Sequence, residues 1–492
     1  MKNKTDSCFF TFSLVFRSLI RIFAVGFSPD YNMIPRIPPP TGGVLCKQSG
    51  KAERVEVIKF SMKKIYKAHI LFTKEKDRFE VFENGYIAVE NGKVTGVSTN
   101  LAELESQEAE VIDFGDKLLI PAMNDMHVHA PQVHNQGVAM DLELLPWLQN
   151  YTFPEESKYA DVDYAERMYR RFLHTQWLFG TMRSVVFGTV HTDSTRVLMK
   201  LYQEAGMGAL VGKVAMNRNC PDTLCEDVDA AVAGYEQLIA EFTQTSNLNP
   251  QTSNLVRPII TPRFVPSCTP ELLKACGELA KKYQLPVQSH LSENVSEIAW
   301  VAELEPDSES YGDAYNHYGL FGQTPTIMAH CVWTAGSELE LMKKNGVMVA
   351  HCPTSNFNLS SGMAPIRTLL DEGVRIGLGS DISGGHDLNM FRMLVYAIQV
   401  SKMHYQLDHN KAFLTLPEIF WIATKSAGSF FGKVGSFEPG YDFDALVIDD
   451  AVLYPSEYSL LHRLERFIYV GDDRQIAHRF CRGREIPEPK LQ

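Results

Sequence analysis

The stretch LLIPAMNDMHVH, Leu118–His129, decides the fold, because a short apolar run there ends in a His-x-His pair. Seven more short apolar runs follow it along the chain, with longer segments of helical spacing between them. They are Ser184–His191, Ala209–Met216, Arg257–Phe264, Val287–Glu293, Thr326–His330, Val347–Pro353 and Arg375–Asp381. Alternating strands and helices indicate a parallel sheet. Eight such units predict an α/β fold of the (β/α)8 TIM-barrel type, with a doubly wound open sheet as the alternative.

The segments between these runs carry helical signals. In Tyr164–Gly180, for example, Met168, Phe172 and Leu173 fall on one face at helical spacing. Such a face can pack against a sheet, so this segment is expected to be a helix that covers the barrel.

Both ends of the folded region read as β-structure. Gly85–Val97 predicts a hairpin with Asn-Gly at its bend. Phe437–Asp450 and Arg466–Asp473 are strand-like, with turn residues between them. The predicted domains are therefore a composite β-sandwich from residues 62–119 and 437–492, and a catalytic barrel from residues 120–436.

The amino-acid composition argues against some classes of protein. The 492 residues include 47 Lys and Arg against 59 Asp and Glu, a net charge of −12, which argues against nucleic-acid binding. The apolar runs are too short or too charged for a transmembrane span. Nine scattered cysteines favour a reducing compartment, and we expect a cytoplasmic protein.

Residues 1–61 are expected to be an extension outside the fold, with Met62 as a possible functional start. The apolar residues 8–27 contain Arg17 and Arg21, which disfavour a signal peptide and leave a membrane-surface helix as the alternative. A Pro-rich linker, Ile34–Gly43, follows.

Potential metal ligands stand at the carboxyl ends of the predicted strands. A lone histidine is more often structural, but five potential ligands at matched strand ends favour a shared site at the barrel mouth. They are His127, His129, His290, His330 and Asp381. Nitrogen and oxygen ligands suit Zn²⁺, with Fe²⁺ as the alternative. Other histidines, such as His134, His174, His191 and His351, lack this placement.

Two further residues bear on the chemistry of this site. Glu293 lies three residues beyond His290, where a carboxylate can move protons between water and a substrate nitrogen. Lys213 on the third predicted strand could bridge two metals if modified, but the other ligands suffice for one metal, so we interpret it as non-ligating.

Several segments resemble the amidohydrolase superfamily, in its deaminase branch with one metal, over roughly Met62 to Pro487. They are PAMNDMHVHAPQ (Pro121–Gln132), TPRF (Thr261–Phe264), SHLSEN (Ser289–Asn294), MAHC (Met328–Cys331), AHCPTSNFNLSSG (Ala350–Gly362) and GLGSDISGG (Gly377–Gly385). Within that branch, HAPQ, TPRF and LPWLQNYTFPEE (Leu145–Glu156) are similar to the guanine deaminase family. Ala122 and Ser380 depart from the superfamily pattern without touching a ligand, and the N-terminal extension has no counterpart in it.

The resemblance implies roles for individual residues. One zinc per chain would be held by His127, His129, His290 and Asp381, with His330 orienting the attacking water and Glu293 as the proton shuttle. Glu293, His330 and Asp381 would form the catalytic set. Gln132 and Arg263 would bind the polar edge of a purine, Phe264 would stack on its ring and Trp147 would close the pocket. The substrate site would also include His129, Ala130, Pro131, His290, Glu293 and Asp381.

The activity implied by this resemblance is zinc-dependent hydrolysis of guanine to xanthine and ammonia, by a homodimer acting on a small purine. A related aminohydrolase acting on a triazine, a pterin or an oxidised guanine is one alternative. A metal-free scaffold that keeps the barrel is another, and the intact ligand set together with Glu293 argues against it.

Overall fold

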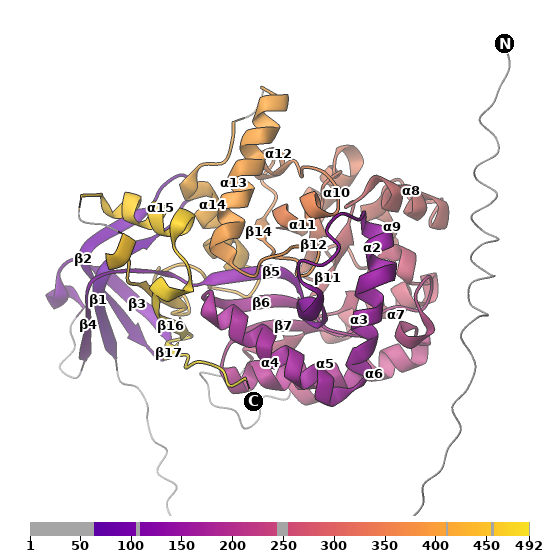
Figure 1. The fold of residues 1–492 in the computed structure, drawn as a ribbon, viewed down its shortest axis with the longest axis horizontal. Helices are drawn as coiled ribbons and strands as arrows, with labels where there is room; N and C mark the ends of the chain where they lie inside the picture. The colour runs from indigo at the N-terminus through magenta and orange to yellow at the C-terminus, as the bar shows by residue number, and fades with distance from the viewer. Residues whose placement is uncertain (1–62, 105–108, 244–253, 410–411, 454–456, 492) are drawn as a thin grey trace, which may run out of the picture. The chain divides into compact units, whose positions relative to one another are not determined.

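The computed structural model describes residues 63–104, 109–243, 254–409, 412–453 and 457–491. The predicted extension, residues 1–61, lies outside them. The described chain contains an α/β barrel and a separate sheet, which are distinct in Figure 1. Within the described residues, no helix is long and apolar enough to cross a membrane.

Strands from both ends of the chain form one seven-stranded sheet, in the order β17-β16-β15-β4-β1-β2-β3. Their bounds are β1 Lys64–Phe72, β2 Glu80–Glu90, β3 Lys93–Ser98, β4 Glu110–Pro121, β15 Ala445–Ile448, β16 Ile476–Cys481 and β17 Arg484–Glu485. Strand β4 joins the two ends, because it pairs with β1 on one side and with β15 on the other. The predicted β-sandwich is not confirmed, since the seven strands are hydrogen-bonded into a single sheet, and the exact domain boundaries stay a prediction.

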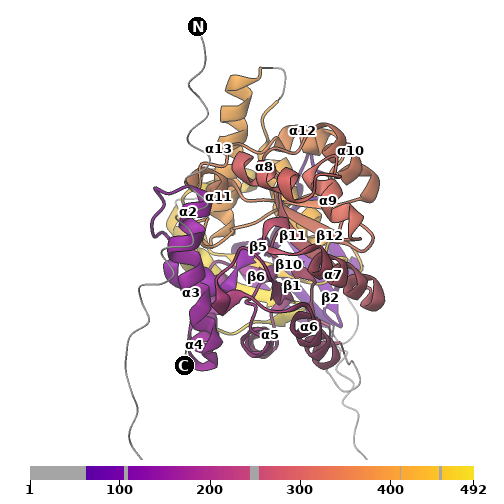
Figure 2. The same ribbon diagram turned by 90° about the vertical axis from the view of Figure 1, so that its right-hand side faces the viewer.

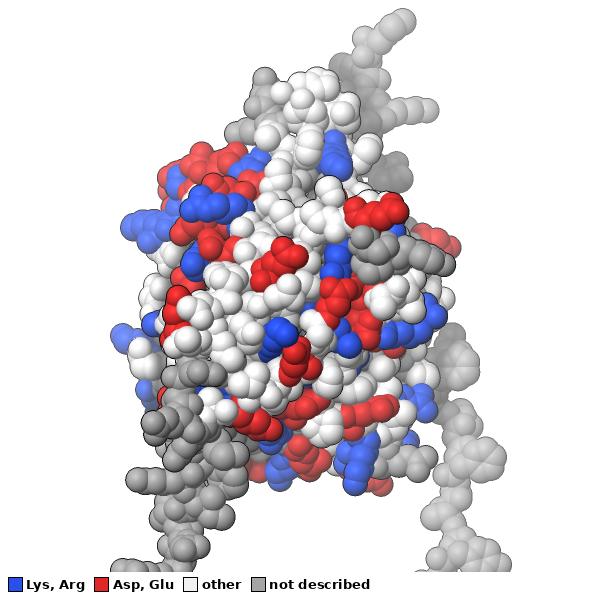
Figure 3. Space-filling model, turned by 90° about the vertical axis from the view of Figure 1, so that its left-hand side faces the viewer, with Lys and Arg blue, Asp and Glu red and all other residues white. Residues whose placement is uncertain are grey.

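The hairpin predicted at Gly85–Val97 is confirmed as β2 and β3. Asn91 and Gly92 at its bend have φ of 52° and 78°, the left-handed conformation that a type I′ turn requires. This sheet has its own apolar core, in which Tyr66 stacks on Phe443 with ring centroids 5.0 Å apart. On the face that carries the sheet, acidic and basic side chains lie beside one another (Figure 3).

The remaining strands form the barrel. Two parallel four-stranded sheets run β5-β6-β7-β9 and β11-β12-β13-β14, and β8 pairs with β10 between them. Their bounds are β5 Met123–His129, β6 Thr181–Phe187, β7 Gly208–Gly212, β8 Val214–Ala215, β9 Val256–Pro258, β10 Thr261–Pro262, β11 Val287–Leu291, β12 Thr326–His330, β13 Met348–His351 and β14 Ile376–Leu378. Taking β7 with β8 and β9 with β10, these segments make eight barrel strands.

Backbone hydrogen bonds join the two four-stranded sheets at both seams. At one seam, Ile260 forms a parallel bridge with Val287. At the other, the amide of Asp381 donates to the carbonyl of His127 at 2.8 Å, so the segment after β14 lies against β5. A doubly wound sheet would have two open edges, whereas in the described residues these bonds close the barrel at both seams. The prediction of a TIM-type barrel is therefore confirmed.

Helices surround the barrel strands (Figures 1 and 2). Their bounds are α2 Leu144–Trp147, α3 Phe153–Ser157, α4 Val162–Leu178, α5 Thr192–Ala205, α6 Val228–Phe242, α7 Pro270–Tyr283, α8 Val295–Leu304, α9 Tyr311–His317, α10 Gly336–Asn345, α11 Pro353–Asn358, α12 Ile366–Asp371, α13 Met390–Leu407, α14 Leu416–Trp421 and α15 Leu460–Val470. The helix expected over Tyr164–Gly180 is α4, and it buries Met168, Phe172 and Leu173 as predicted.

Two predicted strands were wrong in part. Leu118–His129 is two strands, because β4 ends in the terminal sheet at Pro121 and β5 begins in the barrel at Met123. Arg466–Asp473 lies mostly in helix α15, which begins after Ser459, whose side chain accepts a hydrogen bond from the His462 amide. That helix buries Leu464, Phe467 and Ile468 on one face, and a helical spacing fits the same residues that read as a strand.

A buried ion-pair cluster links the barrel to the terminal sheet. Arg183 on β6 is 3% exposed and donates to Asp444 at 2.5 Å and to Asp442 at 2.8 Å, just before β15. Replacing Arg183 with methionine leaves carboxylates buried without their main partner. We expect the free energy of unfolding to fall by about 3–5 kcal/mol, measured by urea denaturation.

The control for this variant is Arg474→Met, which removes a surface pair with Asp472 and should leave the unfolding midpoint unchanged. Equal midpoints for the two variants would contradict a structural role for Arg183.

Candidate active site

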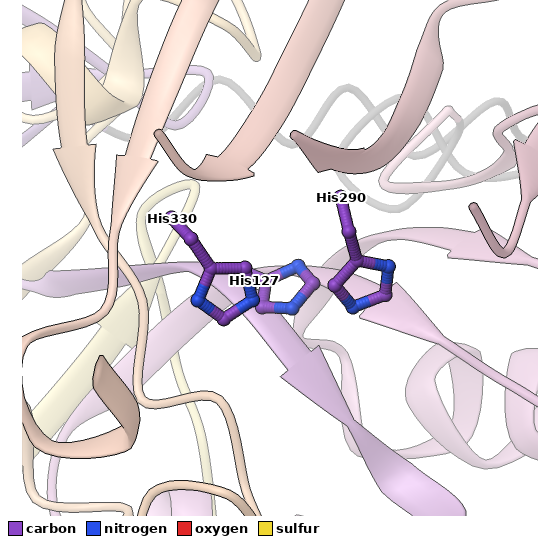
Figure 4. Close-up of side chains that lie close together, drawn as sticks. All are labelled: His127, His290 and His330. Atoms are coloured by element: carbon purple, nitrogen blue, oxygen red, sulfur yellow. The ribbon is translucent and has the colours of Figure 1, made fainter. Parts of the chain in front are cut away.

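The five predicted ligand residues lie together at the carboxyl ends of the barrel strands. His127 and His129 end β5, His290 and His330 lie at the ends of β11 and β12, and Asp381 follows β14 by three residues. Figure 4 shows His127, His290 and His330 reaching from three elements toward one another. Because i and i+2 side chains of a strand share a face, both histidines of the His-x-His pair can reach the same point.

The distances within this cluster are those of a potential metal site. The Nε2 atoms of His127 and His129 lie 3.1 and 3.4 Å from Oδ1 of Asp381. His129 Nε2 is also 3.1 Å from His290 Nε2. Among the described residues, three sets of potential ligand atoms each lie within 4.8 Å of one another: those of His127, His290 and His330, those of His127, His129 and Asp381, and those of His330, Cys352 and Asp381.

The hydrogen bonds of the clustered histidines leave nitrogen lone pairs that could bind a cation. The Nε2 atoms of His127 and His330 are buried and make no hydrogen bond, although carboxylate oxygens of Asp381 and Glu293 lie 3.1 and 3.4 Å away. Such burial is costly unless another group satisfies these atoms. His290 Nδ1 lies 2.6 Å from the carbonyl of Arg263, and a carbonyl can only accept, so the proton sits on Nδ1. The lone pair of His290 is therefore on Nε2, facing the cluster, as a metal ligand requires.

The electrostatics favour the same protonation states for Asp381, His129 and His290, whereas for His330 burial is outweighed by Glu293 and Asp381, which raise its pKa above the ordinary value. Burial opposes ionisation of Asp381, but His127, His330 and His129 hold its pKa well below its usual value. Burial, together with the charge on His127, lowers the pKa of His129 and of His290 well below the ordinary value. An ionised aspartate and neutral imidazoles are the forms that bind a metal.

Glu293 lies beside this cluster, two residues after β11. Its Oε2 atom is 3.4 Å from His330 Nε2, and Ser361 Oγ donates to its Oε1 at 3.2 Å. Burial is the largest cause that raises the pKa of Glu293 to about 7, with His330 acting in the opposite direction. A carboxyl group near neutrality can both release and accept a proton in a reaction cycle.

A pocket of about 420 Å³, including its open mouth, lies over the cluster. The predicted residues that line it are His129, Gln132, Trp147, Arg263, Phe264, His290, Glu293, His330 and Asp381. Leu144, Leu148, Glu297, Leu359 and Gly384 complete the lining. Ala130 and Pro131 are buried in the 3₁₀ helix after β5 and do not line the pocket.

Glu156 on α3 holds the polar end of this pocket together. Its Oε1 accepts from Gln132 Nε2 at 2.7 Å, and its Oε2 accepts from Arg263 Nη1 at 2.6 Å. The sequence carries Glu156 in the segment Leu145–Glu156, but we predicted no role for it. The same holds for Asn356, whose Oδ1 lies 3.0 Å from His330 Nδ1, and for Asp125, which accepts from the Ser380 amide at 3.0 Å.

The residues interpreted as non-ligating lie in other surroundings. Lys213, between β7 and β8, is buried and forms an ion pair with Glu226. His174 lies 2.8 Å from Glu488 near the C-terminal end of the chain. His351 ends β13, and its two ring nitrogens are buried without a hydrogen-bond partner.

Comparisons with known proteins identify the family of this chain. The model of the amidohydrolase family matches residues 118–486. A guanine deaminase of Dictyostelium discoideum is 36% identical over 448 residues, which are 86% of this chain and 98% of that protein. The Escherichia coli guanine deaminase is 32% identical, over 82% of this chain and 92% of its own length.

A solved structure extends the comparison to the fold. Guanine deaminase from C. acetobutylicum, with guanine bound in its active site, is 50% identical, covers 86% of this chain and all of its own, and superposes with a TM-score of 0.83. The chain belongs to the amidohydrolase family, whose members are generally metal-dependent. Its place within that family is among the guanine deaminases, so it is an aminohydrolase acting on a C–N bond of a cyclic substrate.

Proposed function

We propose that this protein hydrolyses guanine to xanthine and ammonia, with one zinc ion per chain, in purine catabolism. The observation that carries the proposal is the pocket itself, in which Arg263 and Gln132 stand beside a metal-ligand cluster and Glu293. The relative with guanine bound in its active site supports the choice of purine. The homodimer and the cytoplasmic location predicted from the sequence belong to the same proposal.

Substrate binding uses both ends of the pocket. Arg263 presents N–H donors and no acceptor, so it suits the C6 carbonyl oxygen of guanine. Phe264 is buried next to it, packs edge-on against Trp300 at 6.4 Å, and would stack on the purine ring. With the carbonyl held at Arg263, the C2 amino group is directed toward Glu293 and the histidine cluster.

The ligand set proposed for the ion is His127, His129, His290 and Asp381, with Fe²⁺ as the alternative metal. A zinc ion bound there would make hydroxide available at neutral pH, because it would lower the pKa of water from 15.7 to about 7. Asp381 takes the proton that the water releases, and His330 positions the attacking oxygen. Glu293 then protonates the ring nitrogen next to C2 as the oxygen adds there. Glu293 next takes the hydroxyl proton of the adduct and delivers it to the amino group, which leaves as ammonia, and the proton held by Asp381 then restores Glu293 to its protonated form.

Release of ammonia from guanine tests this proposal directly. Purified protein loaded with zinc should convert guanine to xanthine in equimolar amounts with ammonia, followed by ultraviolet absorbance and an ammonia assay. Absence of turnover by zinc-loaded, folded protein would refute the assignment.

Replacing Glu293 with glutamine should abolish most turnover while keeping the site intact. Glutamine keeps the size and hydrogen bonding of the side chain but cannot transfer the proton. We expect kcat to fall by about 10²-fold or more, with zinc content and the unfolding midpoint unchanged. Steady-state kinetics and metal analysis check this result.

A suitable control for Glu293 is Glu303→Gln, on the exposed face of α8, which should turn over guanine normally. Near-normal turnover by the Glu293 variant would mean that another group moves the proton.

A further inference from the structure

Glu156 is a buried carboxylate without a place in the reaction described above. It is 2% exposed on the short helix α3 and does not line the pocket. Both of its oxygens are used, one by Gln132 and the other by Arg263. Those are the two residues proposed to bind the polar edge of the purine, and they come from separate elements, after β5 and after β10.

The contacts of Gln132 fix which way its amide group points. Its Nε2 donates to Glu156 Oε1 at 2.7 Å, and its Oε1 accepts from the Ser383 backbone amide at 2.9 Å. A backbone N–H can only donate, so the oxygen of Gln132 must face Ser383. The amide therefore has one orientation, with one N–H and one lone pair left for a ligand.

The contact with Glu156 also determines the charge at this end of the pocket. Arg263 is buried over the ring of Phe153, with its guanidinium carbon 5.3 Å from the ring centre. The Glu156 carboxylate, 2.6 Å from Arg263 Nη1, balances its positive charge. Glu156, Gln132 and Arg263 together form a neutral group that still offers donors.

We propose that Glu156 is a positioning and specificity-determining residue, which makes the polar end of the pocket select an uncharged ring carbonyl over an anionic substituent. It acts through Gln132 and Arg263 rather than by touching the ring. The proposal rests on the proposed function in taking the ligand to be a purine. An unpaired arginine would favour an anion, whereas an arginine already paired with a carboxylate gains little from one.

Binding of two purines that cannot lose an amino group tests the charge argument. Hypoxanthine carries the C6 carbonyl, and purine-6-carboxylate carries an anion at the same position. Calorimetry on the zinc-loaded protein should show that Glu156→Gln shifts the ratio of the two affinities by about tenfold or more toward the carboxylate. Both affinities are measured on the same preparation of each protein, so their ratio does not depend on the fraction of protein that is folded.

Glu155 provides a matched control one residue away. It is also buried, but it accepts from Lys158 at 2.6 Å and from Tyr164 at 2.5 Å, away from Gln132 and Arg263. Glu155→Gln should keep the affinity ratio within about twofold of wild type. For guanine turnover, Glu156→Gln should raise KM by about tenfold with a smaller change in kcat, because binding geometry is lost rather than the proton shuttle.

Two outcomes would overturn the role of Glu156: an unchanged affinity ratio in Glu156→Gln, or an equal shift in Glu155→Gln. The proposed function fails in a different way, through a wild-type protein that binds hypoxanthine but does not deaminate guanine. In that case the affinity ratio still decides the role of Glu156.

Discussion

His127→Ala protein is expected to be purified with almost no zinc and without measurable activity, a fall of about 10⁴-fold or more, because water then loses the ion that lowers its pKa. Asp381→Ala should behave in the same way, since Asp381 Oδ1 lies within 3.4 Å of both His127 and His129. Metal analysis of the purified chains, together with guanine turnover, measures both effects. Wild-type protein should carry close to one zinc per chain.

The control for these ligand variants is His174→Ala, whose ring lies by Glu488 and outside the cluster, and it should keep both zinc and activity. Removal of zinc from wild-type protein by a chelator should abolish turnover, and added zinc should restore it. Two tightly bound metals per chain, with a modified Lys213 between them, would contradict the mononuclear site. Lys213 is instead paired with Glu226.

The cluster of potential ligands could be predicted because its residues lie at the ends of strands, and the ends of the short apolar runs locate these in the sequence. Short apolar runs define the barrel strands, and a parallel barrel brings all their carboxyl ends to one mouth. The order of the strands then places His127, His290 and Asp381 together, although they are far apart in the chain. Backbone architecture alone is enough for this part of the site.

The residues that hold the ligands and the pocket could not be predicted in this way. Glu156 lies 24 residues from Gln132 and 107 from Arg263, and neither spacing corresponds to a repeating element. The sequence does not show whether a glutamate is buried or exposed, because its burial depends on tertiary packing. Asn356, which orients His330, was missed for the same reason.

The two incorrect strands show a related limit. The segment RFIYV in α15 is mostly apolar and short. The spacing of its apolar residues therefore does not distinguish a helix from a strand. Packing decided it, because Phe467 lies edge-on to Phe391 of α13, with ring centroids 4.8 Å apart. At Pro121–Met123 the apolar pattern runs unbroken, while the chain passes from one sheet to the next.

Guanine should be turned over at least about 10⁴-fold more efficiently than adenine, as judged by kcat/KM. Adenine carries an amino donor at C6 where guanine carries a carbonyl. Arg263 has only donors, so adenine would bury a donor against a donor and lose the bond to the guanidinium. Ring-analogue substrates provide the wider comparison: a triazine, a pterin and an oxidised guanine should each be slower than guanine.

Arg263→Ala should lower kcat/KM for guanine by about 10²-fold or more and leave adenine negligible, so the preference for guanine falls by a similar factor. The change also leaves Glu156 buried without its cation, so the unfolding midpoint has to be measured in parallel and rates referred to folded protein. The backbone carbonyl of Arg263 still accepts from His290, so zinc binding should persist and separate substrate recognition from metal loss. Faster turnover of adenine or a triazine than of guanine would refute the substrate assignment and leave the metal site standing, since no metal ligand depends on the guanidinium.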